Sequence, residues 1–315
     1  IPSSVASIGN YAFSYCSSLA QMTFKTPSSL TSIDESAFKD CASLTDIKIP
    51  SSVTSIGSNA FSNCISLTRI EIPSSVTSIG LFTFYNCSSL KYIIIPSSVT
   101  SINSYMFFNC KSLVNIKIPS SVTKIEEYAF CQCTSLEEVI IPPSVTLIQN
   151  GAFKGCSSLL KISLPSISSI KNYTFSQCTR LEGIEIPSSV TKIGKFSFYR
   201  CSSLKKIIIT PSVTKICEEA FGQCSSLMEI SIPSSVKFID NNAFSLCLLL
   251  SKIFIPQSIT KISVNTFKRC LSITEIKIPS SVISIEDGAF EECTSLMQIS
   301  FEEPSSLKSI GNRAF

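Results

Sequence analysis

Histidine and tryptophan are missing from the 315 residues of this chain, and charged residues make up only 15% of it. Without histidine there is no histidine general base, no Ser-His-Asp or Cys-His nucleophile pair and no histidine-ligated metal. An enzyme built on this sequence would depend on carboxylates, lysine or cysteine alone. We therefore expect no enzymatic activity, no cofactor and no metal site.

A large excess of one charge and long apolar runs are also lacking. The chain has 26 lysine and arginine residues against 22 aspartate and glutamate residues, a net charge of +4. A dedicated nucleic-acid-binding protein usually carries a far more basic face. No run of about 18 or more apolar residues occurs, which is the length that a membrane-spanning helix needs. The sequence thus predicts no nucleic-acid partner and no membrane insertion by this segment.

The chain is rich instead in repetition. The segment from residue 60 to 80 reads AFSNCISLTRIEIPSSVTSIG, and nearly the same wording recurs along the whole sequence. A cysteine stands three residues after each repeated phenylalanine except the last, and a leucine, once an isoleucine, stands three residues further on. The fourteen phenylalanines, usually 23 residues apart, are Phe13, Phe38, Phe61, Phe84, Phe107, Phe130, Phe153, Phe175, Phe198, Phe221, Phe244, Phe267, Phe290 and Phe315.

A unit of 23 residues cannot bury a core by itself, but units stacked in register place each apolar position above its copy. The alternation in Ile70-Glu71-Ile72 predicts a short strand with its isoleucines inward. Pro73 cannot donate to a ladder and should end that strand. Ala60-Phe61 suits a tight helical or 3₁₀ turn on the opposite side. The sequence therefore predicts a repeat solenoid.

The repeat also carries a family signature. Its consensus, C-x-x-L-x-x-I-x-I-P-x-x-V-x-x-I-x-x-x-A-F, closely resembles the BspA-like (Treponema pallidum type) leucine-rich repeat over essentially the whole chain. The resemblance implies a curved leucine-rich-repeat-like array with a parallel β-sheet on its concave face. It also implies use as a secreted or cell-surface module for adhesion and binding.

We therefore expect one leucine-rich repeat array over residues 1–315, with about 14 units of 23 residues. Both ends fall inside a unit, so we expect an excerpt of a longer protein, or ends that contact another molecule, with end-to-end self-association as one form. The predicted function is non-catalytic binding of protein or glycoprotein partners, host or matrix proteins if the chain is surface-exposed. The alternative is an intracellular scaffold for protein-protein interaction.

The thirteen aligned cysteines have two interpretations, a disulfide or metal framework and an internal ladder of small apolar side chains. We favour the ladder because free cysteine is among the most buried residue types and because parallel Cβ directions are poor geometry for a disulfide. Cys131 and Cys217 lie outside the ladder. We expect Cys131 to be the thiol that reagents label most readily in the native fold. The serines and threonines of the PSSVTS wording are expected to face water or to cap turns.

Partner-binding candidates lie where the units differ. The residues five and seven positions after each cysteine should face the concave surface, and charges of both signs alternate there, which suits a protein partner. Lys48 beside Glu71 and Lys252 beside Glu275 are expected to offset each other. The same positions carry apolar residues that are either a binding surface or a choice of strand-forming residues: Tyr92, Ile94, Ile140, Ile208 and Phe254.

A second candidate surface is a stripe of aromatic residues around the repeated phenylalanines. Several lie three residues apart and so would share one face of a helical turn. They either mark an interaction surface or shield the core beneath them. The stripe consists of Phe82, Tyr85, Tyr105, Phe108, Tyr128, Phe196 and Tyr199.

The two interpretations of the stripe differ in their response to one double substitution. Replacing Tyr105 and Phe108 together with serine is expected to leave the fold intact and to weaken a partner contact, because other units carry polar residues at these positions. Thermal unfolding of the variant checks the first part. A collapse of its melting temperature would show that the rings belong to the core.

Overall fold

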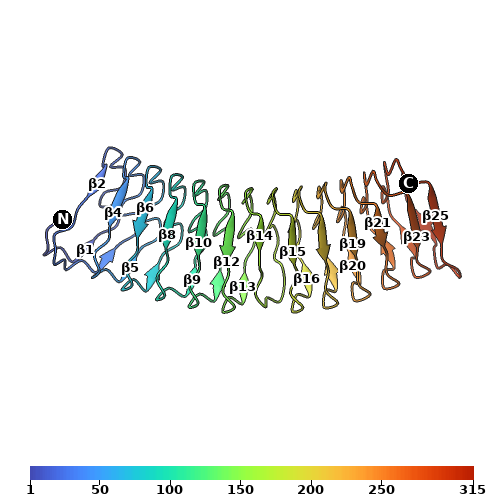
Figure 1. The fold of residues 1–315 in the computed structure, drawn as a ribbon, viewed down its shortest axis with the longest axis horizontal. Coiled ribbons are helices and arrows are strands. Elements are labelled where there is room, and N and C mark those ends of the chain that lie inside the picture. Colours follow the sequence, from blue (N-terminus) through green and yellow to red (C-terminus); the bar gives the residue numbers. More distant parts are fainter. The chain divides into compact units, whose positions relative to one another are not determined.

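The computed structural model describes all residues from 1 to 315 and falls into two compact units, residues 1–165 and residues 166–315. Each unit is a stack of coils, and most coils carry two short strands (Figure 1). The predicted repeat solenoid with parallel sheets is thereby confirmed. That residues 1–315 form one array stays a prediction.

The longer strands form four parallel sheets, and within each sheet the equivalent residues of successive coils lie side by side in register. Ile47 pairs with Ile70, which pairs in turn with Ile93. The surface made by these strands is called the long-strand face of its unit. Its strands are β2 (Gln21–Met22), β4 (Asp46–Lys48), β6 (Arg69–Glu71), β8 (Tyr92–Ile94), β10 (Asn115–Lys117), β12 (Glu138–Ile140) and β14 (Lys161–Ile162) in the first unit, and β15 (Gly183–Glu185), β17 (Lys206–Ile208), β19 (Glu229–Ser231), β21 (Lys252–Phe254), β23 (Glu275–Ile278) and β25 (Gln298–Phe301) in the second.

The other strand of each coil has two residues and forms a second parallel ladder, the short-strand row. Ile56 pairs with Ile79 there, and both side chains are buried. The row consists of β1 (Ser7–Ile8), β3 (Ser32–Ile33), β5 (Ser55–Ile56), β7 (Ser78–Ile79), β9 (Ser101–Ile102), β11 (Lys124–Ile125) and β13 (Leu147–Ile148), and of β16 (Lys192–Ile193), β18 (Lys215–Ile216), β20 (Phe238–Ile239), β22 (Lys261–Ile262), β24 (Ser284–Ile285) and β26 (Ser309–Ile310).

Alternation and proline together define the long strands. In β6 the side chain of Ile70 is buried while those of Arg69 and Glu71 are exposed, because successive side chains of a strand point to opposite faces. Pro73 lacks the N–H that would continue the ladder. Its carbonyl instead accepts a hydrogen bond from the N–H of Val76 at 3.0 Å, which closes the next turn. The predicted strand with inward isoleucines is confirmed.

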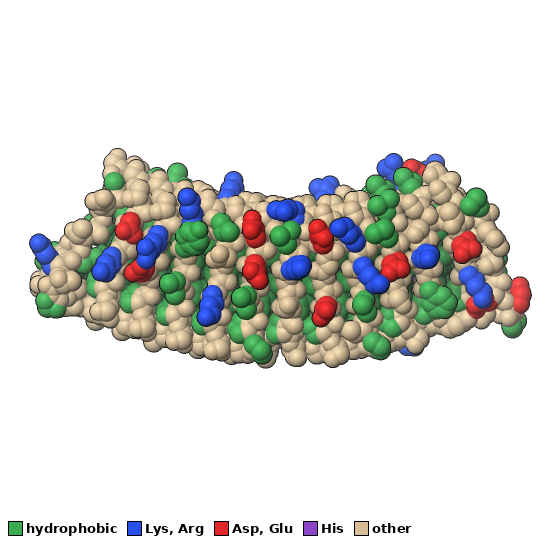
Figure 2. Space-filling model, in the orientation of Figure 1, with side chains coloured by type: hydrophobic (Ala, Val, Ile, Leu, Met, Phe, Trp, Pro, Cys, Tyr) green, Lys and Arg blue, Asp and Glu red, His purple; other side chains and the backbone are tan.

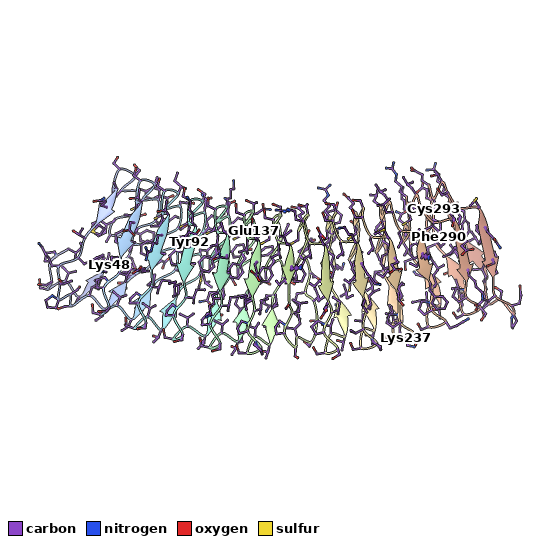
Figure 3. The ribbon with its side chains drawn as sticks, viewed as in Figure 1. Lys48, Tyr92, Glu137, Lys237, Phe290 and Cys293 are labelled. Atoms are coloured by element: carbon purple, nitrogen blue, oxygen red, sulfur yellow. The ribbon has the colours of Figure 1, made fainter.

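Phenylalanine rings form a column through the interior of each unit. Neighbouring rings lie face to face, with centroids 5.4 Å apart between Phe38 and Phe61 and 5.3 Å apart between Phe198 and Phe221. All four side chains are fully buried. Burial of the ring area and the stacked contact both stabilise the fold. Phe290, labelled in Figure 3, belongs to the column of the second unit.

The segment that carries each phenylalanine is a run of turns, and the predicted helical or 3₁₀ turn is not found. Residues two before and two after the phenylalanine are left-handed, as in Asn59 (φ 57°) and Asn63 (φ 60°). The N–H groups of Asn59 and Phe61 donate to the carbonyls of Leu81 and Thr83 in the next coil, each at 2.9 Å. No helix forms because these hydrogen bonds run between coils, which satisfies backbone groups that would otherwise be buried without a partner.

The cysteine ladder lies beside the phenylalanine column. The Sγ of Cys64 donates to the carbonyl oxygen of Phe38 at 3.2 Å, and that of Cys87 to the carbonyl of Phe61 at 3.1 Å. All fifteen cysteines are free thiols, and all but Cys16 are buried. The predicted internal ladder is confirmed, and its thiols serve as small apolar side chains that also satisfy a buried carbonyl.

One serine of the repeated Pro-Ser-Ser-Val segment forms a hydrogen bond between coils. The second serine of the Pro-Ser-Ser-Val turn donates its hydroxyl to the valine carbonyl of the preceding coil, at 2.6 Å from Ser75 to Val53 and at 2.6 Å from Ser121 to Val99. These side chains are only partly exposed. The expectation that such hydroxyls face water or cap turns is therefore wrong for this serine, since it links one coil to the next.

The buried thiols predict a strong loss of stability in alkali. Burial raises the pKa of Cys41 and of Cys293 to about 11, and burial against a neighbouring thiol raises that of Cys87 well above its ordinary value. The unfolded chain releases these protons above about pH 8.5, whereas the folded chain keeps them. The stabilisation is thus complete below that pH and is lost as the pH rises through the folded pKa values. Each thiol that ionises on unfolding contributes a slope of about 1.4 kcal/mol per pH unit.

Urea midpoints measured by circular dichroism between neutral pH and about pH 10.5 are expected to fall steeply above about pH 8.5. Tyrosine and lysine also titrate near this range, so the Cys87→Ala variant serves as the control. It should lose some stability at neutral pH and show a shallower fall with pH than the parent. A midpoint that does not change with pH, or an equal slope in both proteins, would contradict the ladder's role.

Candidate binding surfaces

The long-strand faces expose the five apolar residues that the sequence predicts to face outward. The exposed fractions are 56% for Tyr92, 72% for Ile94, 62% for Ile140, and 64% for both Ile208 and Phe254. Figure 2 shows acidic and basic side chains spread over the strands among apolar side chains. The predicted exposure of the five residues is confirmed, and their part in binding stays a prediction.

In the first unit these residues do not form one cluster. Tyr92 and Ile94 lie on β8, where they pair with Arg69 and Glu71 of β6. Tyr92 and Lys48, both labelled in Figure 3, come from strands of the same sheet. Ile140 lies on β12 in register with Lys117 of β10, so the coil that carries Lys117 separates Ile140 from Ile94. The apolar surface of the first unit is therefore divided by a positive charge.

The expected charge pairs form only in part. Lys48 and Glu71 are in register, yet Glu71 is ion-paired with Arg69 of its own strand and Lys48 has no ion pair. Lys252 and Glu275 also form none. In the second unit Lys206 and Glu229 do pair, at 2.9 Å, and the hydrogen bond from Lys206 lowers the pKa of Glu229.

The two expected pairs, Lys48 with Glu71 and Lys252 with Glu275, are thus corrected. Long side chains at the surface choose among several partners, and each exposed pair is worth little free energy. The unpaired charges remain available to a ligand.

The aromatic stripe of the first unit is a double column of stacked rings. Phe82 stacks on Tyr105 with centroids 4.7 Å apart, Tyr105 on Tyr128 at 5.1 Å, and Tyr85 on Phe108 at 5.0 Å. All five side chains are half-buried. The structure thus brings these predicted residues together. Because the ring faces pack against each other, the column presents ring edges to the solvent and offers little flat surface for stacking a planar ligand.

The double column of aromatic rings in the first unit ends beside a glycine. A Cβ atom at Gly151 would come within 2.4 Å of the Tyr128 ring, and Gly151 has a left-handed φ of 62°. The ring of Tyr128 therefore fills space that only glycine leaves open at the next coil. This arrangement resembles core packing more closely than it resembles an open binding platform.

A smaller aromatic group lies in the second unit. Tyr173 stacks on Phe196 at 5.0 Å, and Phe196 meets Tyr199 edge to face at 5.5 Å. The Gln223 side chain donates to the Tyr199 hydroxyl at 2.6 Å, and the Arg200 guanidinium lies 5.3 Å from its ring centroid. The predicted residues Phe196 and Tyr199 are thus brought together and are already held by polar neighbours.

Several hollows open on the surface of the units. One of about 430 Å³ lies on the long-strand face of the second unit and is lined by Ile208, Ser231 and Phe254. One of about 510 Å³ surrounds Phe238 in the short-strand row. Another, of about 950 Å³, lies in the first unit and includes Phe24.

Sequence reasoning missed Phe238, which is 61% exposed. Its position is serine, lysine or leucine in the other strands of the short-strand row, so a column-by-column comparison could have found it.

Two carboxylates, Glu229 and Glu275, line the hollow on the second long-strand face. A general acid at neutral pH needs a raised carboxyl pKa. The hydrogen bond from Lys206 lowers that of Glu229, and its side chain is 51% exposed. The arrangement therefore suits charge recognition more than acid-base catalysis.

The structure contains no group of three or more cysteine, aspartate and glutamate side chains placed to hold a metal ion. It also contains no helix of the length and apolarity needed to cross a membrane. Cys131 is only 3% exposed and burial raises its pKa to about 11, so the expectation that it labels first is wrong. Small side chains at the position after the phenylalanine are buried, as Ser62 and Ser176 are, and the exposed thiol is Cys16.

The sequence profile of the BspA type Leucine rich repeat region (6 copies) matches residues 1–114, 55–182, 100–228, 148–271 and 260–315. No curated protein matches the chain. Among solved structures, a leucine-rich repeat protein from Bacteroides ovatus is 33% identical, with 99% of this chain and 73% of that chain covered and a TM-score of 0.78.

Two further structures share the fold. A leucine rich cell surface protein from Faecalibacterium prausnitzii is 29% identical, with 90% of this chain and 86% of that chain covered and a TM-score of 0.56. A leucine-rich repeat protein from Eubacterium ventriosum is 24% identical, with 91% and 80% covered and a TM-score of 0.54.

Proposed function

The chain belongs to the BspA type leucine-rich repeat family, and from that premise we propose that it is a non-catalytic binding and adhesion module. It acts at a cell surface or after secretion. Its long-strand faces receive protein or glycoprotein partners, which are host or matrix proteins if the module is exposed at the surface.

One observation carries the proposal: the apolar residues that vary from coil to coil point outward. The interior columns repeat the same phenylalanine, cysteine and leucine, whereas the long-strand faces expose Tyr92, Ile94, Ile140, Ile208 and Phe254 among charges of both signs. Apolar side chains that remain exposed beside charges are typical of surfaces that bind proteins.

The comparisons support the location. The Faecalibacterium prausnitzii relative, 29% identical with a TM-score of 0.56, is described as a leucine rich cell surface protein. That description applies to the relative, and the same location is proposed for this chain. End-to-end self-association stays a prediction.

The binding proposal is tested with a variant that removes the outward apolar residues. Tyr92, Ile94, Ile140, Ile208 and Phe254 are all replaced with threonine, which keeps strand propensity. We expect the parent to bind at least one of a panel of immobilised matrix proteins and glycoproteins, measured by surface plasmon resonance. The variant should bind at least about tenfold more weakly, a loss of about 1.4 kcal/mol.

The matched control replaces five exposed apolar residues outside the long-strand faces with threonine: Ile65, Leu81, Met228, Phe238 and Leu249. It should bind as the parent does. Equal weakening of both variants, or a parent that binds nothing on the panel, would contradict the proposal. Brief trypsin treatment of intact producing cells tests the location, because peptides released only after lysis would favour the intracellular scaffold.

A further inference from the structure

The long-strand face of the second unit contains a gap between two apolar side chains. Ile208, Ser231 and Phe254 are in register on the consecutive strands β17, β19 and β21. Ile208 and Phe254 are each 64% exposed, and the small Ser231 between them leaves a hollow of about 430 Å³. Since neighbouring strands lie about 4.8 Å apart, the two apolar side chains stand roughly 10 Å apart. A single large apolar side chain fits between them.

The charges beside this gap are arranged in a row. Lys206, Glu229, Lys252 and Glu275 occupy the same position of four consecutive coils and all line the hollow. Lys206 and Glu229 pair at 2.9 Å and neutralise each other. The charge of Lys252 also lowers the pKa of Glu229, but neither Lys252 nor Glu275 forms an ion pair, so a positive charge lies one coil beyond the gap and a negative charge lies two coils beyond it. A complementary ligand carries an acidic group and then a basic group along the stacking direction.

The spacing of the coils selects the backbone of that ligand. Side chains on the same face of an extended peptide are about 6.6 Å apart, whereas the coils are about 4.8 Å apart. Over two coils the peptide side chains would therefore be displaced from the coils by nearly 4 Å. An α-helix rises about 5.4 Å per turn, with i, i+4 and i+7 on one face at about 6 Å and 10.5 Å along the axis. A helix lying along the stacking direction therefore keeps one turn over each coil.

We propose that the gap at Ser231 binds an amphipathic helix of a partner protein. The helix places an apolar side chain between Ile208 and Phe254, an acidic side chain at i+4 over Lys252 and a basic side chain at i+7 over Glu275. A helix of opposite direction presents the same three groups in reverse order. The inference rests on the proposed function and specifies the partner chemistry of this one face.

Burial and charge act together in this site. Covering Ile208 and Phe254 removes apolar area from water at about 25 cal/mol per Å². The two ion pairs add specificity more than affinity, because they form at an exposed surface. The affinity for a single short helix is therefore expected to be modest, and the preference for one charge order is the property that identifies the site.

The experiment uses two fluorescent alanine-based helical peptides and the whole chain. Both peptides carry leucine at i; one has glutamate at i+4 and lysine at i+7, and the other has these two charges exchanged. Fluorescence polarisation should show that the parent binds the first peptide at least about fivefold more tightly, a difference of about 1 kcal/mol. In the double variant Lys252→Glu with Glu275→Lys, the preference should reverse.

Two further variants make the result specific. Ser231→Leu fills the gap and should abolish binding of both peptides, with an unchanged circular dichroism spectrum showing that the fold is intact. The matched exchange Lys48→Glu with Glu71→Lys, in the first unit, should leave the preference unchanged. A third peptide with the same composition and a central proline cannot form the helix. Equal binding of that peptide would overturn the helical ligand.

The proposal is also overturned if both helical peptides bind more weakly than about 1 mM, or if the Lys252 and Glu275 exchange leaves the preference as it was. These outcomes are separate from failure of the proposed function. A chain that binds the matrix panel through its outward apolar residues but ignores the peptides would retain its binding role and lose only this ligand.

Discussion

Each coil can bury its interior only against the same positions of the coils on either side. Three contacts require that equivalent residues lie at equivalent places in successive coils. Each phenylalanine ring stacks on its copy at about 5.4 Å, each thiol donates to the preceding phenylalanine carbonyl, and the backbone N–H groups donate to the next coil. A shift of one residue would turn the strand side chains to the wrong face. Phe13 and Phe38 are 25 residues apart instead of 23, and a change of length is tolerated only outside the columns. Two extra residues in the segment 23–27 still leave Phe13 stacked on Phe38 at 5.2 Å.

This constraint also decides where function can lie. The interior columns are fixed by packing, and their thiols are buried with raised pKa values, so they are poor nucleophiles. Large and charged side chains vary mainly where they reach solvent, on the long-strand faces, in the short-strand row and along the aromatic stripe. Among these, the stripe uses its ring faces for its own stacking, while the apolar side chains of Ile208 and Phe254 are exposed on either side of Ser231. The long-strand faces are therefore the better binding surfaces.

Periodicity in the sequence was sufficient to predict the columns, the inward isoleucines and the exposure of the strand residues, because each follows from a side chain's position within the unit. The turns around phenylalanine were predicted as helical because a small residue before a large one fits a helix equally well. Asparagine at positions 59, 63, 86 and 109 was the available signal, since it tolerates the left-handed region. Tyr105 and Tyr128 adopt the same conformation with no such signal, because the hydrogen bonds between coils impose it. The choice of Arg69 over Lys48 as the partner of Glu71 depends on side-chain geometry that spacing does not contain.

The equivalence of coils is tested most directly by deletion. Removal of residues 85–107 takes out 23 residues and joins Phe84 to Phe108, so every column stays in register. Removal of residues 85–96 is smaller but joins Phe84 to Ser97, which deletes β8 and puts the following coil out of register. The account predicts that the larger deletion folds with a cooperative thermal transition close to that of the parent, while the smaller one loses it, measured by circular dichroism. Equal damage from both deletions would contradict it.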